Sequence, residues 1–308
     1  MNQRNVILAG MFGFLIVPAC SAQEEGNNAL LEKIKLPDGF AIEMYAPDIP
    51  NARGMDLADD GTLFVGSRNN GSIYAITSDR EVIVIDQGLE MPAGLDYYNG
   101  DLYVSAVSKI FKYPGIIENL EAPPKPIIIK DDFPRETWHG WKFIKFGPDG
   151  KLYVPVGAPC NVCLEENPIF SSITRINADG TGMEIIAQGV RNTVGFDWNP
   201  ETGDLWFTDN GRDNLGDNIP PDELNRLTEA GQHFGFPFVH GDDIHDPEFW
   251  EQRPQGFEWT KPQLNLEAHV AALGMRFYQG DMFPENYQEV SFSPNMVPGT
   301  VPARSVTG

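Results

Sequence analysis

Short apolar strands separated by turns form a unit that recurs along the chain. In each copy a turn ends in Gly, and Leu then opens a strand rich in aromatic and β-branched residues; the four copies are Gly61-Thr62-Leu63-Phe64-Val65, Gly100-Asp101-Leu102-Tyr103-Val104, Gly150-Lys151-Leu152-Tyr153-Val154 and Gly203-Asp204-Leu205-Trp206-Phe207. Their leucines lie 39, 50 and 53 residues apart. Strands joined by Asp-Gly and Asn-Gly turns form antiparallel hairpins. A multi-stranded repeat of about forty to fifty residues is typical of propeller blades.

Further strands follow these units at Ser72–Ile76, Lys109–Tyr113 and Ser172–Ile176. No long stretch carries a sustained helical stripe of apolar residues, and 25 prolines and 31 glycines interrupt the chain throughout. The sequence therefore predicts an all-β fold of β-propeller type, with one domain over about residues 30–290.

The C-terminal part departs from this pattern. Leu273–Tyr278 and Gly280–Pro284 resemble the start of another blade, but residues 291–308 are rich in Pro, Ser, Thr and Gly and lack strand alternation. A propeller closes its ring, because an open blade leaves unpaired edges. We expect the last blade to be incomplete and residues 291–308 to be a disordered tail.

The first 22 residues have the pattern of an export signal. Arg4 supplies a positive start, and a mainly apolar run of twelve residues, Val6 to Val17, precedes small residues through Ala22. This run is shorter than a membrane-spanning helix needs. Cleavage after Ala22 would release a soluble protein, whereas lipidation of Cys20 would anchor the protein to the membrane. Residues 1–22 are thus predicted to be a signal peptide or lipoprotein signal that exports the protein to the periplasm.

Charge and cysteines narrow the classes of partner. With 44 acidic and 22 basic residues the formal net charge is -22, which disfavours binding to nucleic acid or to an anionic membrane surface. Cys160 and Cys163 share one short loop, and in an oxidising compartment a local disulfide is expected. No His follows Cys163, as haem attachment would require, and no second cysteine pair completes a zinc site.

Three loops hold groups that could converge on one site. His139, flanked by Trp138 and Trp141, suits a general base near neutral pH, or is a loop histidine that caps or packs. Arg191 and Asn192 suit binding of carbonyls or carboxylates, or an inter-blade salt bridge.

The third loop, residues 209–225, is rich in Asp and Asn and contains Gly211. Its oxygens suit a hard cation, although ordinary Asx turns also explain such residues. The spacing of His233, His240 and His245 matches no metal motif. These histidines and His269 are therefore interpreted as structural or surface residues.

In this order, these segments resemble the glucose/sorbosone dehydrogenase family of soluble quinoproteins that use pyrroloquinoline quinone (PQQ), and most of all its sorbosone dehydrogenase branch. The resemblance runs from about Leu36 to about Gln288, and its most specific stretches are residues 138–163, 189–225 and 231–237. It implies a six-bladed β-propeller with PQQ and calcium at the top of the central channel.

The resemblance also implies roles for individual residues. His139 matches the catalytic base that removes the proton from the substrate hydroxyl. Arg191 and Asn192 match residues that contact the quinone carbonyls. Gly211 and Arg212 match positions whose backbone carbonyls coordinate the calcium ion. The implied reaction is hydride transfer from the carbinol carbon to the quinone, with Arg191 and calcium stabilising the charge on the quinone oxygen.

Two departures from the family pattern matter. Trp138 stands where glucose-oxidising relatives have an Asp that contacts the sugar, so glucose specificity does not carry over. The family's last blade contributes cationic residues to the PQQ carboxylates, and nothing after Gln288 matches it. A weaker affinity for PQQ and a lower stability than in a full-length relative are therefore expected.

The predicted function is a PQQ-dependent oxidoreductase that oxidises a sugar-type hydroxyl or a hydrated aldehyde and passes electrons to a quinone or a haem protein. Two alternatives stay open: a non-catalytic or degenerate propeller that binds glycan or protein, and a calcium-dependent lactonase. A lactonase needs side-chain carboxylates around its metal, and a binding module needs no catalytic histidine. The joint presence of His139 with Arg191 and Asn192 favours the dehydrogenase.

Overall fold

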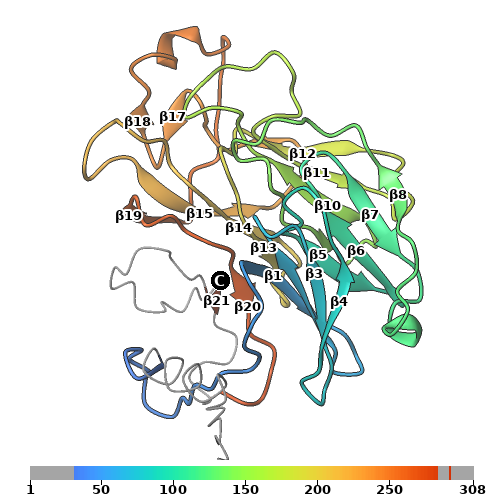
Figure 1. The fold of residues 1–308 in the computed structure, drawn as a ribbon. Helices are drawn as coiled ribbons and strands as arrows, with labels where there is room; N and C mark the ends of the chain where they lie inside the picture. The colour runs from blue at the N-terminus through green and yellow to red at the C-terminus, as the bar shows by residue number, and fades with distance from the viewer. Residues whose placement is uncertain (1–30, 284–290, 293–308) are drawn as a thin grey trace, which may run out of the picture. The chain divides into compact units, whose positions relative to one another are not determined.

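The computed structural model of the protein describes residues 31–283 and 291–292 (Figure 1). The chain divides into two compact units, Met1–Pro47 and Asp48–Gly308. The described residues of the first unit, 31–47, contain no strand, so every described strand belongs to the second unit. No helix within the described ranges has the length and apolar character to cross a membrane. The predicted signal with Cys20 lies outside the described residues, as do residues 293–308 of the predicted tail.

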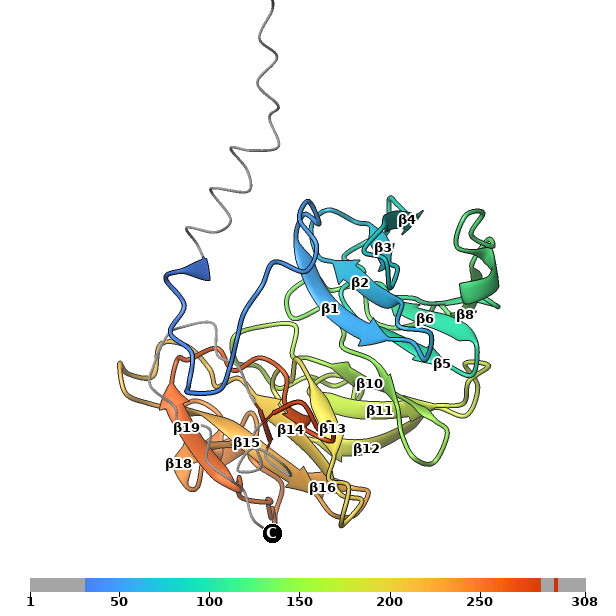
Figure 2. The ribbon, with the colours of Figure 1, turned by 90° about the horizontal axis from the view of Figure 1, so that it is seen from below.

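Four antiparallel sheets follow one another along the second unit, and we call them blades 1 to 4. Blade 1 consists of β1 (Ala52–Leu57), β2 (Leu63–Ser67), β3 (Ile73–Ile76) and β4 (Val82–Asp86). Blade 2 consists of β5 (Leu95–Tyr98), β6 (Asp101–Ser105), β7 (Ile110–Tyr113) and β8 (Ile127–Lys130). Figure 2 shows these two blades beside each other.

Blades 3 and 4 are joined by a strand that crosses between them. Blade 3 consists of β9 (Lys145–Phe146), β10 (Leu152–Val156), β11 (Ser172–Ile176) and β12 (Glu184–Gln188). Blade 4 consists of β13 (Phe196–Trp198), β14 (Leu205–Asp209), β15 (Pro221–Leu227) and β19 (Leu264–Ala268). Between its last two strands the chain returns to blade 3, where β16 (Gln232–His233) pairs in parallel with β12.

The prediction of an all-β propeller-type fold is confirmed, and each Gly-turn-Leu unit opens the second strand of a blade: β2, β6, β10 and β14. These strands read as continuous apolar runs because the blades pack on both of their faces. The hydrophobic core is accordingly divided into clusters between neighbouring blades. Phe64 of blade 1 and Leu102 of blade 2, for example, share the first cluster and are fully buried.

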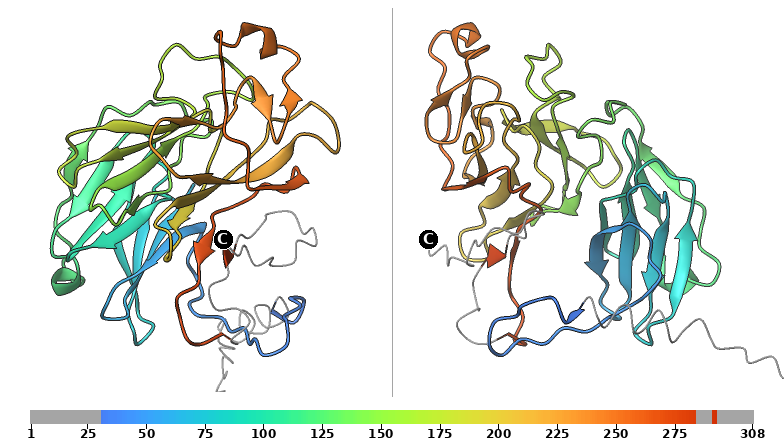
Figure 3. Two further views of the ribbon diagram at one scale, coloured as in Figure 1. Left: turned by 180° about the vertical axis from the view of Figure 1, so that it is seen from behind. Right: turned by 60° about the vertical axis from the view of Figure 1, so that its left-hand side comes forward.

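The prediction of six blades is wrong for the described residues, which form four. After blade 4 they add only β20 (Arg276–Phe277), paired with β21 (Ser291–Phe292). Residues 228–263 are long enough for a blade, but they form an insertion with β16, the hairpin of β17 (Val239–His240) and β18 (Ile244–His245), and the 3₁₀ turn η2 (Trp250–Gln252). Figure 3 shows this insertion at one end of blade 4. A second short 3₁₀ turn, η1 (Ile117–Asn119), precedes β8.

A carboxylate on the inner strand of one blade binds the backbone of the next. Asp56 Oδ2 accepts a hydrogen bond from Tyr97 N–H at 2.8 Å, and Asp96 Oδ2 accepts one from Phe146 N–H at 2.7 Å. The third instance of this contact is Asp197 Oδ2, which accepts from Phe277 N–H at 3.0 Å. Each carboxylate therefore accepts a hydrogen bond from a strand N–H of the next blade, which has no partner within the sheet of that next blade. We call these contacts the inter-blade carboxylate bonds.

A glycine two residues before each of these aspartates lets the blades approach. A Cβ atom on Gly54 would lie 2.1 Å from Ala93 O, and one on Gly94 would lie 2.1 Å from Lys142 O. Blade 3 has neither the glycine nor the aspartate at the equivalent place. There Lys145 Nζ forms an ion pair with Asp197 Oδ1 at 2.5 Å instead.

The inter-blade bond of Asp96 predicts a pH dependence of stability. Burial, followed by the charge of Asp56, raises the pKa of Asp96 to about 8. Between about pH 4 and pH 8 the folded protein thus holds a proton that the unfolded chain has lost, so this group makes unfolding easier as pH rises. Asp96→Asn keeps an oxygen for Phe146 N–H and has no charge to bury. We expect this variant to exceed the wild type in stability at pH 8, on the order of 2 kcal/mol, and by less at pH 5.

The measurement is chemical denaturation at pH 5 and pH 8. The exposed Asp79, replaced by Asn, is the matched control and should follow the wild type at both pH values. Equal losses of stability between pH 5 and pH 8 in Asp96→Asn and the wild type would contradict the assignment.

Candidate active site

The imidazole of His139 is held in one tautomer. His139 precedes β9 and adopts a left-handed φ of 50°. Its Nε2 accepts a hydrogen bond from the Trp138 indole N–H at 3.1 Å, so Nδ1 carries the proton and donates it to Ala158 O at 2.8 Å. The lone pair of His139 that can accept a substrate proton is therefore on Nε2.

Burial lowers the pKa of His139 to about 4, and the positive charge of Arg191 adds to this effect. The hydrogen bond to Ala158 acts in the opposite direction but is the weaker influence. The imidazole is thus neutral at ordinary pH, which is the state that a general base requires.

The backbone of one residue, Ala158, connects His139 with Arg191. The Ala158 N–H donates to Arg191 O at 2.8 Å, while Ala158 O accepts from His139. Gly157 makes room for this approach, since a Cβ atom there would lie 2.6 Å from His139 Cβ and 3.3 Å from Arg191 O. The loops that carry the two residues are therefore fixed against each other.

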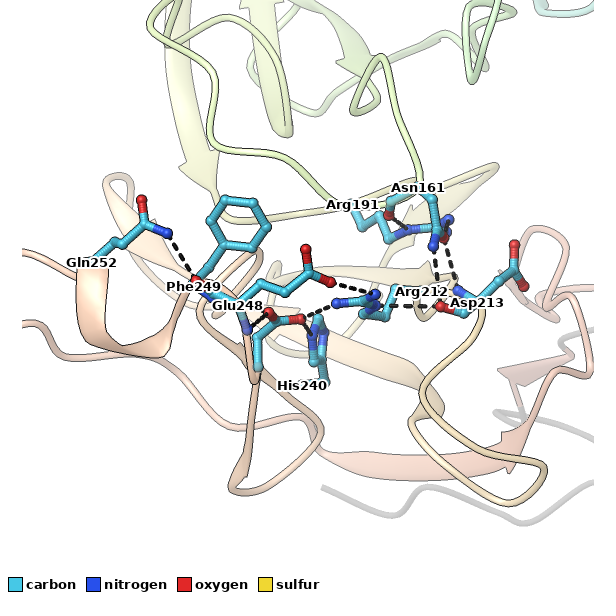
Figure 4. Close-up of polar contacts among 9 residues, drawn as sticks. Asn161, Arg191, Arg212, Asp213, His240, Glu248, Phe249 and Gln252 are labelled. Carbon is cyan, nitrogen blue, oxygen red and sulfur yellow. Dashed lines mark hydrogen bonds and ion pairs between the residues drawn. The ribbon is translucent and has the colours of Figure 1, made fainter.

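Arg191 is 4% exposed, and its guanidinium group is bound on three sides. Nε donates to Asn161 O at 2.8 Å, and one terminal nitrogen donates to Asn161 Oδ1 at 3.0 Å (Figure 4). The other terminal nitrogen donates to Asn210 O at 3.0 Å. Two of its five N–H groups make no hydrogen bond to a described residue and are open to a ligand. The side chain forms no ion pair with a carboxylate of residues 31–283, so the alternative interpretation, an inter-blade salt bridge, does not hold within that range.

Asn161 connects Arg191 with the loop after β14. Its Oδ1 also accepts from Asp213 N–H at 2.8 Å, and its Nδ2 donates to Asp213 O at 3.0 Å. Asn161 lies between Cys160 and Cys163, which form a disulfide. Asn161 is not among the residues that the sequence pattern indicates. Its position inside a closed four-residue ring is the signal that could have done so, because such a ring presents its polar atoms in a fixed direction.

Arg212 has a structural side chain. It pairs with Asp246 at 2.5 Å and with Glu248 at 3.1 Å, and Asp246 also contacts His240 Nε2 at 3.0 Å (Figure 4). Asp246 is completely buried, so the two partners compensate its charge. This group joins the insertion to the loop after β14, and it leaves the backbone of Arg212 as the part available to a ligand.

The backbone of Arg191 and Asn192 is fixed by a buried carboxylate. Asp209 accepts the N–H of Arg191 at 2.8 Å and the N–H of Asn192 at 2.6 Å. Burial, and after it the charge of Glu223, raises the pKa of Asp209 well above its usual range. The side-chain amide of Asn192 makes no hydrogen bond to any described residue, which leaves it free for a ligand.

The oxygens available to a cation belong to the backbone. Among the described residues no three His, Cys, Asp or Glu side chains are grouped to hold a metal ion. The carbonyls of Gly211 and Arg212 accept no hydrogen bond from any described residue. Free carbonyls, a free amide and the remaining guanidinium N–H groups are the donor set that a calcium ion and a carbonyl-bearing cofactor would use, so the residues fit such a pair.

The other histidines have structural contacts. His233 accepts from Gly235 N–H at 3.0 Å, and burial lowers its pKa to about 4. His245 stacks on Trp250 with ring centroids 3.5 Å apart, and His269 donates to Gly216 O at 2.7 Å.

Solved structures of low sequence identity share this fold. The chain is similar to the holo form of the PQQ domain of pyranose dehydrogenase from Coprinopsis cinerea, with a TM-score of 0.66 and 16% identity over 80% of this chain and 73% of that chain. It is also similar to the apo-form of the soluble aldose sugar dehydrogenase from Escherichia coli, with a TM-score of 0.65 and 16% identity over 82% of each chain.

Sequence comparisons agree with the fold. An uncharacterized protein of Borreliella burgdorferi is 36% identical over 291 residues, which cover 89% of this chain and 74% of that protein. The sequence model of the family described as Glucose / Sorbosone dehydrogenase matches residues 127–297, a range that contains His139, Arg191, Asn192, Gly211 and Arg212 and extends past residue 290. The chain therefore belongs to the glucose/sorbosone dehydrogenase family.

Proposed function

We propose that the protein is a PQQ-dependent dehydrogenase that oxidises a sugar-type hydroxyl or a hydrated aldehyde, with His139 as the general base. The observation that supports this most directly is the neutral imidazole of His139, with its Nε2 lone pair, tied through Ala158 to a buried arginine. This pairs a proton acceptor with a fixed positive charge, as alcohol oxidation requires. In this proposal the protein is exported, and a quinone or a haem protein takes up the electrons.

The residues that would hold the cofactors come from two loops. Arg191 and Asn192 would bind the quinone carbonyls through the guanidinium N–H groups and the amide that the protein leaves free. The carbonyls of Gly211 and Arg212 would hold calcium. PQQ, when bound, supplies the two-electron acceptor for the hydride of the carbinol carbon.

The proton of the substrate hydroxyl goes to His139 Nε2. The Nδ1–H bond to Ala158 O keeps Nε2 unprotonated and fixes the plane of the ring. In the structure the Trp138 indole N–H donates a hydrogen bond to His139 Nε2. The Trp138 side chain is 55% exposed, so it can move aside and let a substrate hydroxyl donate to Nε2 instead. Trp138 is thus placed to contact the substrate directly.

Arg191 stabilises negative charge without moving. Three of its N–H groups are fixed by Asn161 and Asn210, so the direction of the other two is set before a ligand binds. A preorganised cation in a buried site is more effective than one that must be ordered during the reaction.

A titration of the full chain with PQQ in calcium buffer tests the proposed function. We expect saturable binding with a raised melting temperature, and then PQQ-dependent reduction of an artificial electron acceptor by aldoses or aldehydes. His139→Ala should bind PQQ nearly as well but lose turnover by at least about a hundredfold. A wild type that binds no PQQ, or a His139→Ala variant with full turnover, would refute the proposal.

The lowered pKa of His139 predicts the acidic limit of activity. Since the base must be neutral and its pKa is about 4, kcat/KM should stay level from pH 8 down to about pH 5 and fall tenfold per pH unit below pH 4. Titration of the His139 ring by NMR provides the same pKa without turnover. An acidic limb near the ordinary histidine value, about 6.5, would contradict the buried environment described here.

Asn161 is predicted to set the affinity for PQQ by positioning Arg191. Asn161→Leu has nearly the same size but loses the side-chain bonds to Arg191 and to Asp213. We expect PQQ to bind about tenfold more weakly, and the terminal N–H of Arg191 that Asn161 Oδ1 accepts to exchange faster with solvent in hydrogen-exchange NMR. Asn167→Leu in the same connection is the control, and unchanged exchange and affinity in Asn161→Leu would exclude the positioning role.

A further inference from the structure

Two arginines from blade 1 gather on one tryptophan near the candidate active site. Trp141 lies two residues after His139, in the connection to β9. The guanidinium carbon of Arg53, in β1, lies 4.5 Å from the centroid of the Trp141 ring, and that of Arg68, which follows β2, lies 5.5 Å from it. Both cations therefore share the π-system of a single indole.

Neither arginine has an anionic partner in the described part of the chain. The side chains of Arg53 and Arg68 make no ion pair and no hydrogen bond there. Five other arginines are paired or hydrogen-bonded: Arg175, Arg191, Arg212, Arg226 and Arg253.

The two like charges disfavour each other. Burial, and then the charge of Arg68, lowers the pKa of Arg53. The contact with Trp141 compensates only in part, since a partly exposed cation–π contact is a weak interaction. An anion between the guanidinium groups would remove the repulsion and satisfy their free N–H groups.

Arg53 and Trp141 line a cavity of about 430 Å³, and Arg68 adjoins it through its contact with Trp141. Its wall is mainly apolar, and the side chains that give it this character are Met55, Trp141, Phe143, Val194, Leu273 and Met275. Arg53 and Arg276 are its charged lining residues. The cavity therefore suits a molecule with an apolar or flat body and an anionic group directed to Arg53, whose indole partner Trp141 also carries Arg68.

We propose that Arg53 and Arg68, held on Trp141, form an anion subsite that binds a carboxylate of a small molecule whose body lies in this cavity. A carboxylate matches the planar fork of a guanidinium group and can bridge two of them. Resting on the proposed function, the carboxylate belongs either to the quinone cofactor or to an acidic sugar substrate. The two sources share this chemistry and are separated by experiment.

The subsite itself is tested without the cofactor. Isophthalate, a flat dicarboxylate, is titrated into the full chain by calorimetry, with the neutral isophthalamide as the matched ligand. We expect saturable binding of isophthalate alone, weakened about tenfold or more in Arg53→Gln/Arg68→Gln and largely retained in Arg53→Lys/Arg68→Lys. The control Arg80→Gln/Arg135→Gln loses the same charge and should bind like the wild type.

Several results would overturn the subsite. They are no binding of isophthalate by the wild type, equal binding of isophthalate and isophthalamide, and equal binding of isophthalate by the wild type and the Gln pair. The Lys pair keeps the test valid if the Gln pair fails to fold, because lysines preserve the charge. In that case, loss of isophthalate binding on replacing Trp141 by Ala, in a folded variant, supports the subsite, and retained binding contradicts it.

Two measurements on the Gln pair identify the source of the carboxylate: the affinity for PQQ and the KM for acidic and neutral sugars. Weaker binding of PQQ to the Gln pair, with the control unchanged, assigns the subsite to the cofactor. Unchanged PQQ affinity with a raised KM for a uronic acid, and no change in KM for the neutral sugar, assigns it to the substrate. A wild type that binds isophthalate at the arginines but never binds PQQ would retain the subsite and refute the proposed function.

Discussion

The hydrogen bond from a strand N–H of one blade to a carboxylate of the previous blade is the contact on which the rest of the structure depends. Asp56, Asp96 and Asp197 each receive one such bond at the inner edge of their sheet. An isolated blade would leave this N–H exposed and its apolar faces uncovered. The carboxylates therefore set the spacing of the inner strands, and the loops that follow those strands inherit that spacing.

The candidate active site uses the same principle at closer range. Asp209 receives the backbone N–H groups of Arg191 and Asn192, and Asn161 receives the guanidinium of Arg191. None of these contacts is available within a single loop. The site is built where the loops of two blades meet the insertion of blade 4, and its groups are rigid because each is bound by a residue from another segment.

The sequence contained enough to predict the strand units and the residues that converge. Gly-turn-Leu marks a strand because the turn requires glycine and the buried strand requires Leu. Gly211 follows such a strand, β14, whereas His139 and Arg191 precede the first strands of blades 3 and 4, β9 and β13. The pattern did not show that Asn161 would hold Arg191 or that Asp246 would hold Arg212, because these contacts depend on how distant loops meet.

The number of blades was not predictable from the repeat for a related reason. Residues 228–263 are long enough for a blade but are used as an insertion. Its Phe234 packs against Phe207 of blade 4, whereas Phe238 packs against Phe257 within the insertion. The repeat with Asp two residues after Gly, seen at Gly54, Gly94 and Gly195, was present in the sequence. The sequence alone does not show that each Asp accepts a hydrogen bond, because the partner N–H lies in the next blade.

The parallel pairing of β16 with β12 has a mechanical consequence. A segment that leaves blade 4 completes the outer edge of blade 3, and its His233 fits against Gly189, where a Cβ atom would lie 2.3 Å from the ring. Blade 3 cannot lose its edge strand without pulling on the chain of blade 4, so thermal openings of the two are expected to coincide. Stacked repeats usually fray one unit at a time. Here the chain crosses from blade 4 to blade 3 and back, so these two blades, whose loops carry His139 and Arg191, are expected to open together.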